Sequence, residues 1–274
     1  MGKVWRLILD KKGEGYYNMA LDEALHLNYY QNNTPTLRIY GWAQPFISLG
    51  YNQKPQDVLT SKNTLPFVRR STGGSAILHD QEITYSLVCS LEDLSLPKSV
   101  KDSYRIICSW LKRFYSCLGL EAHFAGDKIK GSYSKNKSLK LTQKTLGLYS
   151  NFCFLSYQHF DLLIKDKKIG GNAQRRKRNI IFQQGSIPQR LNFKMIRESI
   201  KQTEDLKQKT TCLDKVLGEK TKFSYLRSLL ARSFKLSFGL KIKAKGIDFA
   251  ERKQVNRLLA DKYSLESWNA GRKN

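Results

Sequence analysis

Apolar residues recur at two different spacings along this chain. Over Lys98–Leu118 they alternate steps of four and three, with Pro97 before the segment and Gly119 after it, which predicts an amphipathic helix. A shorter stripe of the same kind predicts a helix over Tyr17–Leu27, with Asn18 as its N-cap. Three more helices are predicted in the last third of the chain, over Phe193–Ile200, Phe223–Phe238 and Asp248–Tyr263.

Short apolar runs between turn residues predict β-strands. Two of them, Thr36–Gly41 and Pro45–Gly50, are predicted to pair with each other around Trp42, whose indole is expected to help wall a hydrophobic cavity. Asn179–Phe182, together with Ser186–Ile187, is expected to close the sheet. The other predicted strands are Val4–Leu9, Phe67–Arg69, Ser75–Leu78, Ile83–Cys89 and Phe160–Ile164.

One segment has too few apolar residues for either pattern. Residues 126–148 are rich in Lys, Ser and Asn, which predicts a mobile basic loop. Such a loop either orders when a partner docks or is a solvated insertion without a role, and the sequence leaves both open. No internal repeat or linker divides the chain, so we predict a single domain over 1–274 with a mainly helical part at 192–274.

Lysine and arginine outnumber the acidic residues by 48 to 23, which gives the chain a net charge of +25. A charge of this size attracts acidic partners over long range at low salt. Nucleic acid is the first partner that it suggests, but no helix-turn-helix, zinc-finger or RNP-like pattern accompanies it, so no nucleic-acid partner is expected. Acidic proteins fit the charge equally well, and lysine-rich coding bias is a third interpretation.

Cysteine usage and hydropathy together indicate a compartment. The five cysteines, at positions 89, 108, 117, 153 and 212, show no CxxC or Cys/His ligand spacing, so neither a disulfide framework nor a metal site is expected. The first residues lack the apolar run of a signal peptide, and no run is long enough to span a membrane. We therefore expect a soluble, cytoplasmic protein with no membrane partner, in which Cys108 and Cys117 are packing residues of the helix over Lys98–Leu118.

The candidate chemistry lies between residues 150 and 187. Cys153 stands between two phenylalanines and is followed by a strand-like run, a Lys-Lys-Ile-Gly-Gly turn and a basic hairpin. A thiol is suited to take an acyl group from a thioester, and nearby cations favour its reactive thiolate form. Lys168 could act as a base or stabilise the developing oxyanion, and four more cations follow at 175–178. A buried, inert cysteine and a solvated basic turn are the structural alternatives.

Three separated blocks carry a resemblance to a known family. Residues 68–80, VRRSTGGSAILHD, resemble the RRxxGGxxxxHD signature of the biotin/lipoate protein ligase superfamily, and residues 168–174, KIGGNAQ, resemble its K-[IV]-x-G-x-A-[QY] segment. Residues 153–162 resemble the CFxxxxxx[DE]L run of the cysteine-dependent octanoyltransferase branch, the LipM type, a run that ATP-using lipoate ligases lack. Similarity at 18–25 and 262–268 extends the match over almost the whole chain.

This resemblance implies a fold and an activity. The implied fold is α+β, with mixed, largely antiparallel sheets flanked by helices. The implied activity is transfer of an octanoyl or lipoyl group from acyl carrier protein to a lysine of a lipoyl-accepting protein, such as glycine cleavage H protein or a dehydrogenase E2 lipoyl domain, through a thioester on the enzyme. Such carriers are typically acidic. No cofactor is implied, because the donor carries the acyl group on its own phosphopantetheine. The implied catalytic residues are Cys153 and Lys168, and the implied substrate-binding residues are Arg70, Gly73, Gly74, His79, Gly170, Gly171, Asn172 and Ala173.

The members of the first block have separate expected roles. Gly73 and Gly74 would let an acyl chain lie against bare backbone. Arg70 would hold the acidic carrier or its phosphopantetheine arm. His79 would line the reaction centre or polarise the carbonyl, although a lone histidine beside an aspartate is more often one half of a structural hydrogen-bonded pair.

Two other activities share these motifs. An ATP-dependent lipoate-protein ligase would use the same arginine, glycines and lysine, but it would make an acyl-adenylate and would need no cysteine. An octanoyl amidotransferase acting between lipoyl proteins would use the same cysteine. The chain also departs from the family at Ser75, Asn172 and Gln184, where Arg or Gly, Ser, and His are common. Its preference for acyl chain or partner is therefore expected to differ from that of its relatives.

Overall fold

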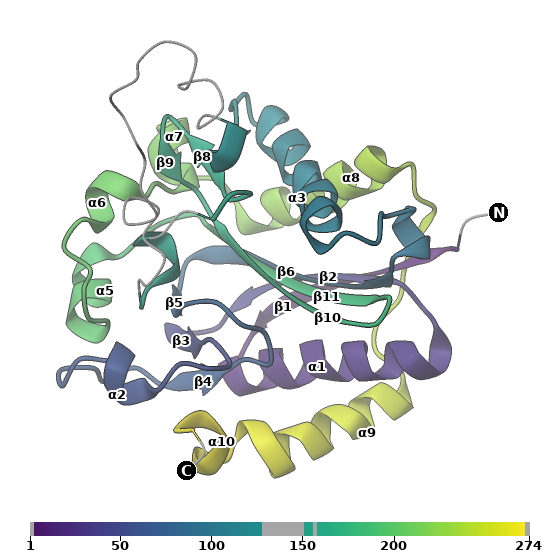
Figure 1. Ribbon diagram of the computed structural model, residues 1–274, viewed down its shortest axis with the longest axis horizontal. Coiled ribbons are helices and arrows are strands. Elements are labelled where there is room, and N and C mark those ends of the chain that lie inside the picture. The colour runs from purple at the N-terminus through teal and green to yellow at the C-terminus, as the bar shows by residue number, and fades with distance from the viewer. Residues whose placement is uncertain (1–2, 128–150, 156–157, 272–274) are drawn as a thin grey trace.

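A mixed six-stranded sheet forms the centre of the molecule in a computed structural model that describes residues 3–127, 151–155 and 158–271 (Figure 1). Its strands lie in the order β10-β11-β6-β2-β1-β12. Strand β1 runs parallel to β2 and β12, and the other neighbours are antiparallel. From residue 128 on, the predicted basic loop at 126–148 lies outside the described residues. The six strands are β1 (Trp5–Gly13), β2 (Thr36–Trp42), β6 (Glu82–Ser90), β10 (Gly171–Lys177), β11 (Ile180–Pro188) and β12 (Ile242–Ala244).

Two three-stranded sheets complete the β-structure. One has the order β4-β3-β5 and the other the order β7-β8-β9. They consist of β3 (Phe46–Leu49), β4 (Phe67–Arg69), β5 (Ile77–His79), β7 (His123–Phe124), β8 (Leu162–Ile164) and β9 (Lys167–Lys168). The pairing predicted between the runs on either side of Trp42 is wrong: β2 already has β1 and β6 as neighbours, so β3 pairs with β4 and β5 instead. The strand expected to close the sheet, β11, lies inside it, and β10 is the edge.

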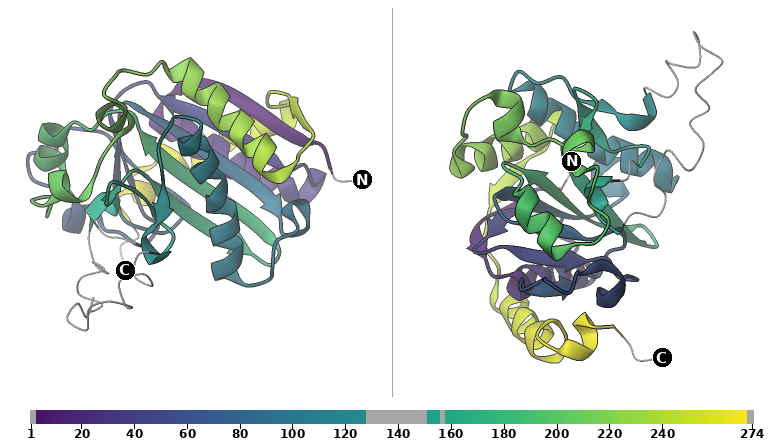
Figure 2. Two further views of the ribbon diagram at one scale, coloured as in Figure 1. Left: turned by 90° about the horizontal axis from the view of Figure 1, so that it is seen from above. Right: turned by 90° about the vertical axis from the view of Figure 1, so that its left-hand side faces the viewer.

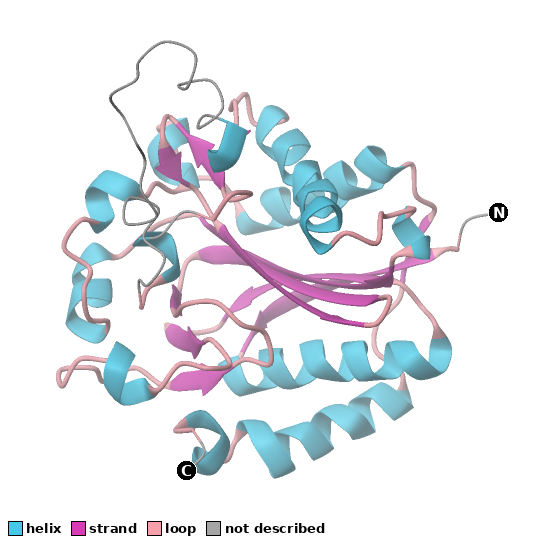
Figure 3. Ribbon diagram, viewed as in Figure 1, coloured by secondary structure: helices cyan, strands magenta, loops and turns pink. Residues whose placement is uncertain are grey.

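Four long helices cover the two faces of the large sheet (Figures 1 and 2). Helices α3 (Val100–Ser116) and α8 (Phe223–Phe238) lie on one face, whereas α1 (Gly15–Asn32) lies on the other with α9 (Phe249–Leu258) packed outside it. Figure 3 shows the strands enclosed between these two helical layers. The shorter helices are α2 (Pro55–Val58), α5 (Phe193–Ser199), α6 (Leu206–Lys209), α7 (Leu213–Leu217) and α10 (Glu266–Asn269), with 3₁₀ turns at Glu92–Leu94 and Cys153–Leu155 and a π turn at Leu259–Tyr263.

Local sequence explains where these helices begin. The Ser99 hydroxyl accepts the backbone N–H of Asp102 at the start of α3, and Asp248 forms a capping box with Glu251 at the start of α9. The predicted Asn18 cap is wrong, because α1 begins earlier and the Glu14 carboxylate caps it. One other expectation fails at the far end of α3, where Cys117 is exposed and is not a packing residue, whereas Cys108 is buried as predicted.

The alternation of side chains on β6 divides the interior. Ile83, Tyr85, Leu87 and Cys89 join the core beneath α3 and α8, whereas Val88 joins the core beneath α1. A third core lies under the β4-β3-β5 sheet and includes the phenylalanines on either side of Cys153. The candidate site described below lies where this small sheet meets the large one. Among the described residues, no helix is long and apolar enough to cross a bilayer.

Candidate active site

Cys153 is held at the edge of a pocket by the residues on either side of it. Phe152 and Phe154 are almost fully buried in the third core, and the Cys153 N–H donates a hydrogen bond of 2.9 Å to the carbonyl oxygen of Ala76, just before β5. The thiol itself is only half-buried and lines the pocket. The apolar neighbours that suggested an inert cysteine therefore anchor the segment and leave the sulfur accessible.

A tight hairpin brings Lys168 to this sulfur. The turn is made by Lys165 and Asp166, which both have positive φ angles, so the turn predicted at the Lys-Lys-Ile-Gly-Gly segment is misplaced. Lys168 is the last residue of β9, and its Nζ donates to the Cys153 carbonyl oxygen at 2.7 Å. The same Nζ lies 3.8 Å from Cys153 Sγ. The structure thus brings the two predicted catalytic side chains into contact.

A buried carboxylate determines the charge of Lys168. Asp161 Oδ2 lies 2.6 Å from Lys168 Nζ, and only 3 % and 1 % of these two side chains are exposed. Burial lowers the pKa of Lys168, but the charge of Asp161, followed by that of Cys153, raises it above its ordinary value overall. Lys168 is therefore an ammonium group at neutral pH, which can stabilise negative charge but cannot accept a proton. Of the two roles expected for it, base and oxyanion partner, the second fits this geometry.

The second set of expected cations lies farther away. Strand β10 begins at Gly171 beside the sulfur and carries its basic residues outward. Arg175 is four residues beyond Gly171, which corresponds to about 13 Å along an extended strand. That separation exceeds the distance over which exposed charges interact strongly at physiological salt, about 8 Å. Cations 175–178 therefore contribute little to the charge at the thiol.

Close packing against the sulfur explains Gly171. A Cβ built on Gly171 would lie 2.8 Å from Cys153 Sγ, which is too close for any side chain. We expect Gly171→Ala to displace and shield the sulfur, and so to slow alkylation of Cys153 by iodoacetamide. Gly246→Ala is the control, because nothing lies within 4 Å of that Cβ. Equal alkylation rates in the two variants would contradict the packing argument.

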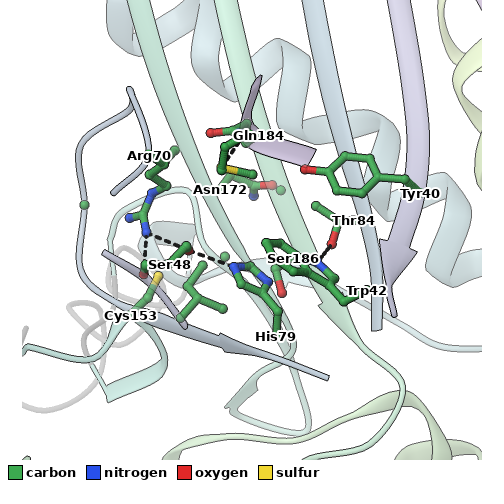
Figure 4. A pocket seen from close by; sticks show the side chains of 16 residues that line it. Tyr40, Trp42, Ser48, Arg70, His79, Thr84, Cys153, Asn172, Gln184 and Ser186 are labelled. Atoms are coloured by element: carbon green, nitrogen blue, oxygen red, sulfur yellow. Dashed lines mark hydrogen bonds between the residues drawn. The ribbon is translucent and has the colours of Figure 1, made fainter. Parts of the chain in front are cut away.

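The pocket beside Cys153 encloses about 420 Å³, including the space at its open mouth. Figure 4 shows its lining side chains, which come from the large sheet, the β4-β3-β5 sheet and the segment carrying the cysteine. The lining residues are Met19, Tyr40, Trp42, Ser48, Arg70, Gly74, Ile77, His79, Thr84, Cys153, Gly171, Asn172, Ala173, Gln184, Gly185 and Ser186.

Arg70 points into the molecule and not toward a docking protein. Its side chain is buried, and its two terminal nitrogens donate to the backbone oxygens of Ser48, Gly73 and Ser75 at 2.8–3.0 Å. Gly74, with a φ of +88°, lets the loop wrap around the guanidinium, because a Cβ there would lie 3.1 Å from Nη2. The glycines of this block therefore shape the loop around its own arginine.

Both ring nitrogens of His79 have protein partners. Nδ1 lies 2.8 Å from Glu82 Oε1, and Nε2 lies 2.7 Å from the Ser48 hydroxyl. The ring also stacks on Trp42 at 3.9 Å between centroids. Burial raises the pKa of Glu82, but His79 and the hydroxyls of Thr84 and Ser186 lower it overall, so Glu82 is a carboxylate that accepts from Nδ1–H. His79 thus forms a wall of the pocket through a hydrogen-bonded pair with Glu82, not with Asp80.

Sequence reasoning gave no role to a second buried carboxylate, which binds two of the residues that line the pocket, Tyr40 and Gln184. Asp22, on α1, accepts hydrogen bonds from Arg38, Tyr40, Ser86 and Gln184 at 2.6–2.8 Å. The Gln184 carbonyl in turn accepts from the Thr72 hydroxyl at 2.9 Å. The only sequence signal for Asp22 was its position in the block at 18–25, and for Asp161 its position in the run at 153–162.

The expected site residues divide into three groups. Cys153, Arg70, Gly74, His79, Gly171, Asn172 and Ala173 line the pocket, and Lys168 lies directly behind the sulfur. Gly73 is not among the residues that line the pocket; nothing lies within 4 Å of a Cβ built on it, and its carbonyl accepts a hydrogen bond from Arg70. Gly170 also lies outside, packed against the Ser186 carbonyl. Among the residues that the structure describes, no group of three or more His, Cys, Asp or Glu could hold a metal ion.

The fold matches that of lipoate-protein ligases. A crystal structure of lipoate-protein ligase A bound with ATP superposes with a TM-score of 0.78 at 21 % identity, covering 98 % of this chain and 99 % of that one. Residues 14–235 match the lipoyl protein ligase A/B catalytic domain. The α+β fold expected from the sequence is confirmed.

The full-length relatives indicate which type of enzyme within this family the chain resembles. Octanoyltransferase LipM of Kyrpidia tusciae is 33 % identical, covering 97 % of this chain and 98 % of its own, and Octanoyltransferase LipM of Halalkalibacterium halodurans is 30 % identical, covering 97 % and 99 %. The chain belongs to the lipoyl protein ligase A/B catalytic domain family and, within it, to the LipM-type octanoyltransferases, which are acyltransferases.

Proposed function

We propose that this chain, acting as one catalytic domain, transfers an octanoyl group from acyl carrier protein to a lysine of a lipoyl-accepting protein through a thioester on Cys153. The observation that carries the proposal is the half-buried sulfur that lines the pocket, 3.8 Å from the ammonium group of Lys168. The names of the full-length relatives support the octanoyl group, and the cysteine supports a covalent intermediate.

In the first half of the reaction, Sγ attacks the carbonyl carbon of the donor thioester. A new C–S bond forms, the negative charge passes to the carbonyl oxygen, and the donor thiolate leaves and takes a proton from solvent. Lys168 holds a full positive charge beside these atoms throughout, because Asp161 keeps it protonated. Gly171 leaves the space in which the carbonyl group can approach the sulfur.

In the second half, the neutral ε-amine of an acceptor lysine attacks the acyl-enzyme. A C–N bond forms, the C–S bond breaks, the amine proton passes to solvent, and the Cys153 thiolate is restored. Since an amide is more stable than a thioester, the transfer runs downhill without ATP.

The pocket supports binding of a medium-length acyl chain. Apolar side chains such as Met19, Trp42 and Ile77 line it, together with Gln184, whose amide donates a hydrogen bond to the buried Asp22. Burial of each CH₂ contributes about 0.8 kcal/mol, so an eight-carbon chain gains several kcal/mol from such a site. A longer chain that reached Gln184 would have to break its hydrogen bond to Asp22, which favours a limit on chain length.

The expected partners are acidic carrier proteins. The net charge of +25 supports their attraction to the enzyme at low salt. We propose acyl carrier protein as the donor and the glycine cleavage H protein or the lipoyl domains of dehydrogenases as acceptors.

Intact-mass analysis tests the proposal. After incubation with octanoyl-acyl carrier protein, the wild-type protein is expected to gain the mass of one octanoyl group, and Cys153→Ala is expected to gain none. Cys117→Ala is the matched control, because Cys117 is the exposed cysteine remote from the pocket. Loading of Cys153→Ala to the wild-type extent would reject the thioester.

The same assay separates the two alternative activities. An ATP-dependent lipoate-protein ligase would leave the wild-type protein unloaded and would release pyrophosphate when octanoate and ATP are supplied. An amidotransferase would be loaded by an octanoylated lipoyl domain and not by the octanoylated acyl carrier protein. Either result would contradict acyl carrier protein as the acyl donor.

A further inference from the structure

Two cations lie near the sulfur of Cys153, and they differ in whether an acidic side chain neutralises their charge. Lys168 is paired at 2.6 Å with Asp161, and both side chains are almost fully buried. A buried ammonium and carboxylate in contact carry no net charge as a unit. The nearest uncompensated positive charge must therefore come from another residue.

Arg70 is a buried guanidinium without an acidic partner. It is 4 % exposed, and its donors are directed at neutral acceptors: the oxygens of Gly73 and Ser75, and both the carbonyl and the hydroxyl of Ser48. Its Nε–H is buried and has no hydrogen-bond partner among the described residues. Buried charges are normally paired, because burial of an isolated ion costs many kcal/mol.

No Asp or Glu side chain is available as a counter-ion for Arg70. The stretches outside the description, residues 1–2, 128–150, 156–157 and 272–274, contain no Asp or Glu. Every acidic side chain is therefore among the described residues, and none of them forms an ion pair with Arg70. The nearby Glu82 is engaged by His79, Thr84 and Ser186.

The group that faces Arg70 across the pocket is Cys153. Both residues line the same pocket, and Figure 4 shows the guanidinium and the sulfur directed toward each other beside Ser48. Burial lowers the pKa of Arg70 to about 10, and the charge on Cys153 is the one influence that opposes this lowering. The other titratable side chains of the pocket are Tyr40 and His79, whose hydrogen bonds go to Asp22, and to Glu82 and Ser48.

We propose that Arg70 supplies the net positive charge that stabilises the Cys153 thiolate and then the oxyanion formed on it, in addition to the contact that the ion-paired Lys168 makes with the sulfur. This proposal rests on the proposed function for the second step only. In that step the charge moves from sulfur to the carbonyl oxygen as the C–S bond forms, and it departs with the donor thiolate. An unpaired Nε–H and a charge without a counter-ion can follow such a moving negative charge better than the ion pair of Lys168.

Alkylation of the thiol tests the first step without any acyl donor or acceptor. At pH 7, Arg70→Gln is expected to react with iodoacetamide at Cys153 at least about tenfold more slowly than the wild type, because the sulfur loses the uncompensated positive charge that faces it. Arg70→Lys keeps the charge without the planar fork and is expected to recover part of the rate. Arg232→Gln, which removes an exposed arginine of α8, is expected to react at the wild-type rate. A folded Arg70→Gln variant that reacts at the wild-type rate would overturn the proposal.

A second pair of variants tests whether Arg70 lacks a counter-ion, even when Arg70→Gln does not fold. Cys153→Asp and Cys153→Asn have the same shape and differ in one negative charge. If Arg70 lacks a counter-ion, the carboxylate provides one, and Cys153→Asp is expected to have the higher melting temperature at pH 7. An equal or lower melting temperature for Cys153→Asp rejects the proposal. Neither experiment measures acyl transfer. Both can therefore be interpreted even if the proposed function is wrong.

Discussion

Lys168→Met is expected to lose about 3–5 kcal/mol of unfolding free energy, because it leaves the Asp161 carboxylate buried without its cation. In a chain of this size such a loss corresponds to a fall of roughly 10 °C in melting temperature. We also expect octanoyl loading of Cys153 to slow by about 10²–10³-fold, since the ammonium group in contact with Cys153 Sγ is removed. Denaturant unfolding and time-resolved intact mass measure the two effects.

The double variant Asp161→Asn/Lys168→Met separates the effect on stability from the effect on the loading rate. Removing both charges of a buried pair is often close to neutral, so the double variant is expected to recover most of the stability but none of the loading rate. Lys194→Met is the control, because it removes a lysine whose ion pair lies at the surface, and it is expected to stay within about 0.5 kcal/mol of the wild type. Recovery of the loading rate in the double variant would show that Lys168 acts only on the fold.

The pH dependence of this stability follows from the raised pKa of Lys168. A lysine whose pKa is higher in the folded than in the unfolded state stabilises fully below its unfolded value, about 10.4, and loses this contribution as the pH rises through the folded value. The difference in stability between the wild type and Lys168→Met is therefore expected to persist through neutral pH and to shrink only in strong alkali.

The long helices and the positions of several strands, such as β4, could be predicted from the sequence. The apolar spacing over Phe223–Phe238 gives the bounds of α8, because one face of that helix is buried throughout. Strand partners could not be predicted in this way, since alternation indicates which face of a strand is buried and not which strand lies beside it. The pairing of β2 with β1 and β6, and of β3 with β4 and β5, is settled by contacts between distant segments. Strand β12, with three residues, has no pattern of its own.

The same distinction applies to the site. Cys153 and Lys168 were identified because their chemistry is visible in the residue types and in the motifs around them. The charges of these two side chains could not be identified from the sequence, because they depend on partners that only the folded chain brings together. Asp161 reaches Lys168 through the turn at Lys165 and Asp166, and Gln184 meets Asp22 across 162 positions of sequence. The absence of a carboxylate at Arg70 could be seen only once its surroundings were known.

Asp22→Asn is expected to destabilise the protein by about 3–5 kcal/mol, measured by denaturant unfolding. Asp22 is fully buried and accepts from four donors, on Arg38, Tyr40, Ser86 and Gln184. An asparagine has only one acceptor oxygen, so its NH₂ group must face at least one of these donors, and the guanidinium of Arg38 loses its buried counter-ion.

Asp10→Asn is the matched control, because Asp10 contacts the same guanidinium at 3.0 Å but is one-third exposed. Its loss is expected to cost no more than about 1 kcal/mol, as for pairs that water screens. Because the Asp22 carboxylate also fixes Gln184, which lines the pocket, Asp22→Asn is expected to widen the range of acyl-chain lengths that load onto Cys153, whereas Asp10→Asn is not. Equal costs for the two substitutions would mean that burial of the carboxylate is not what stabilises this cluster, and an unchanged chain-length profile would mean that Gln184 does not limit the chain.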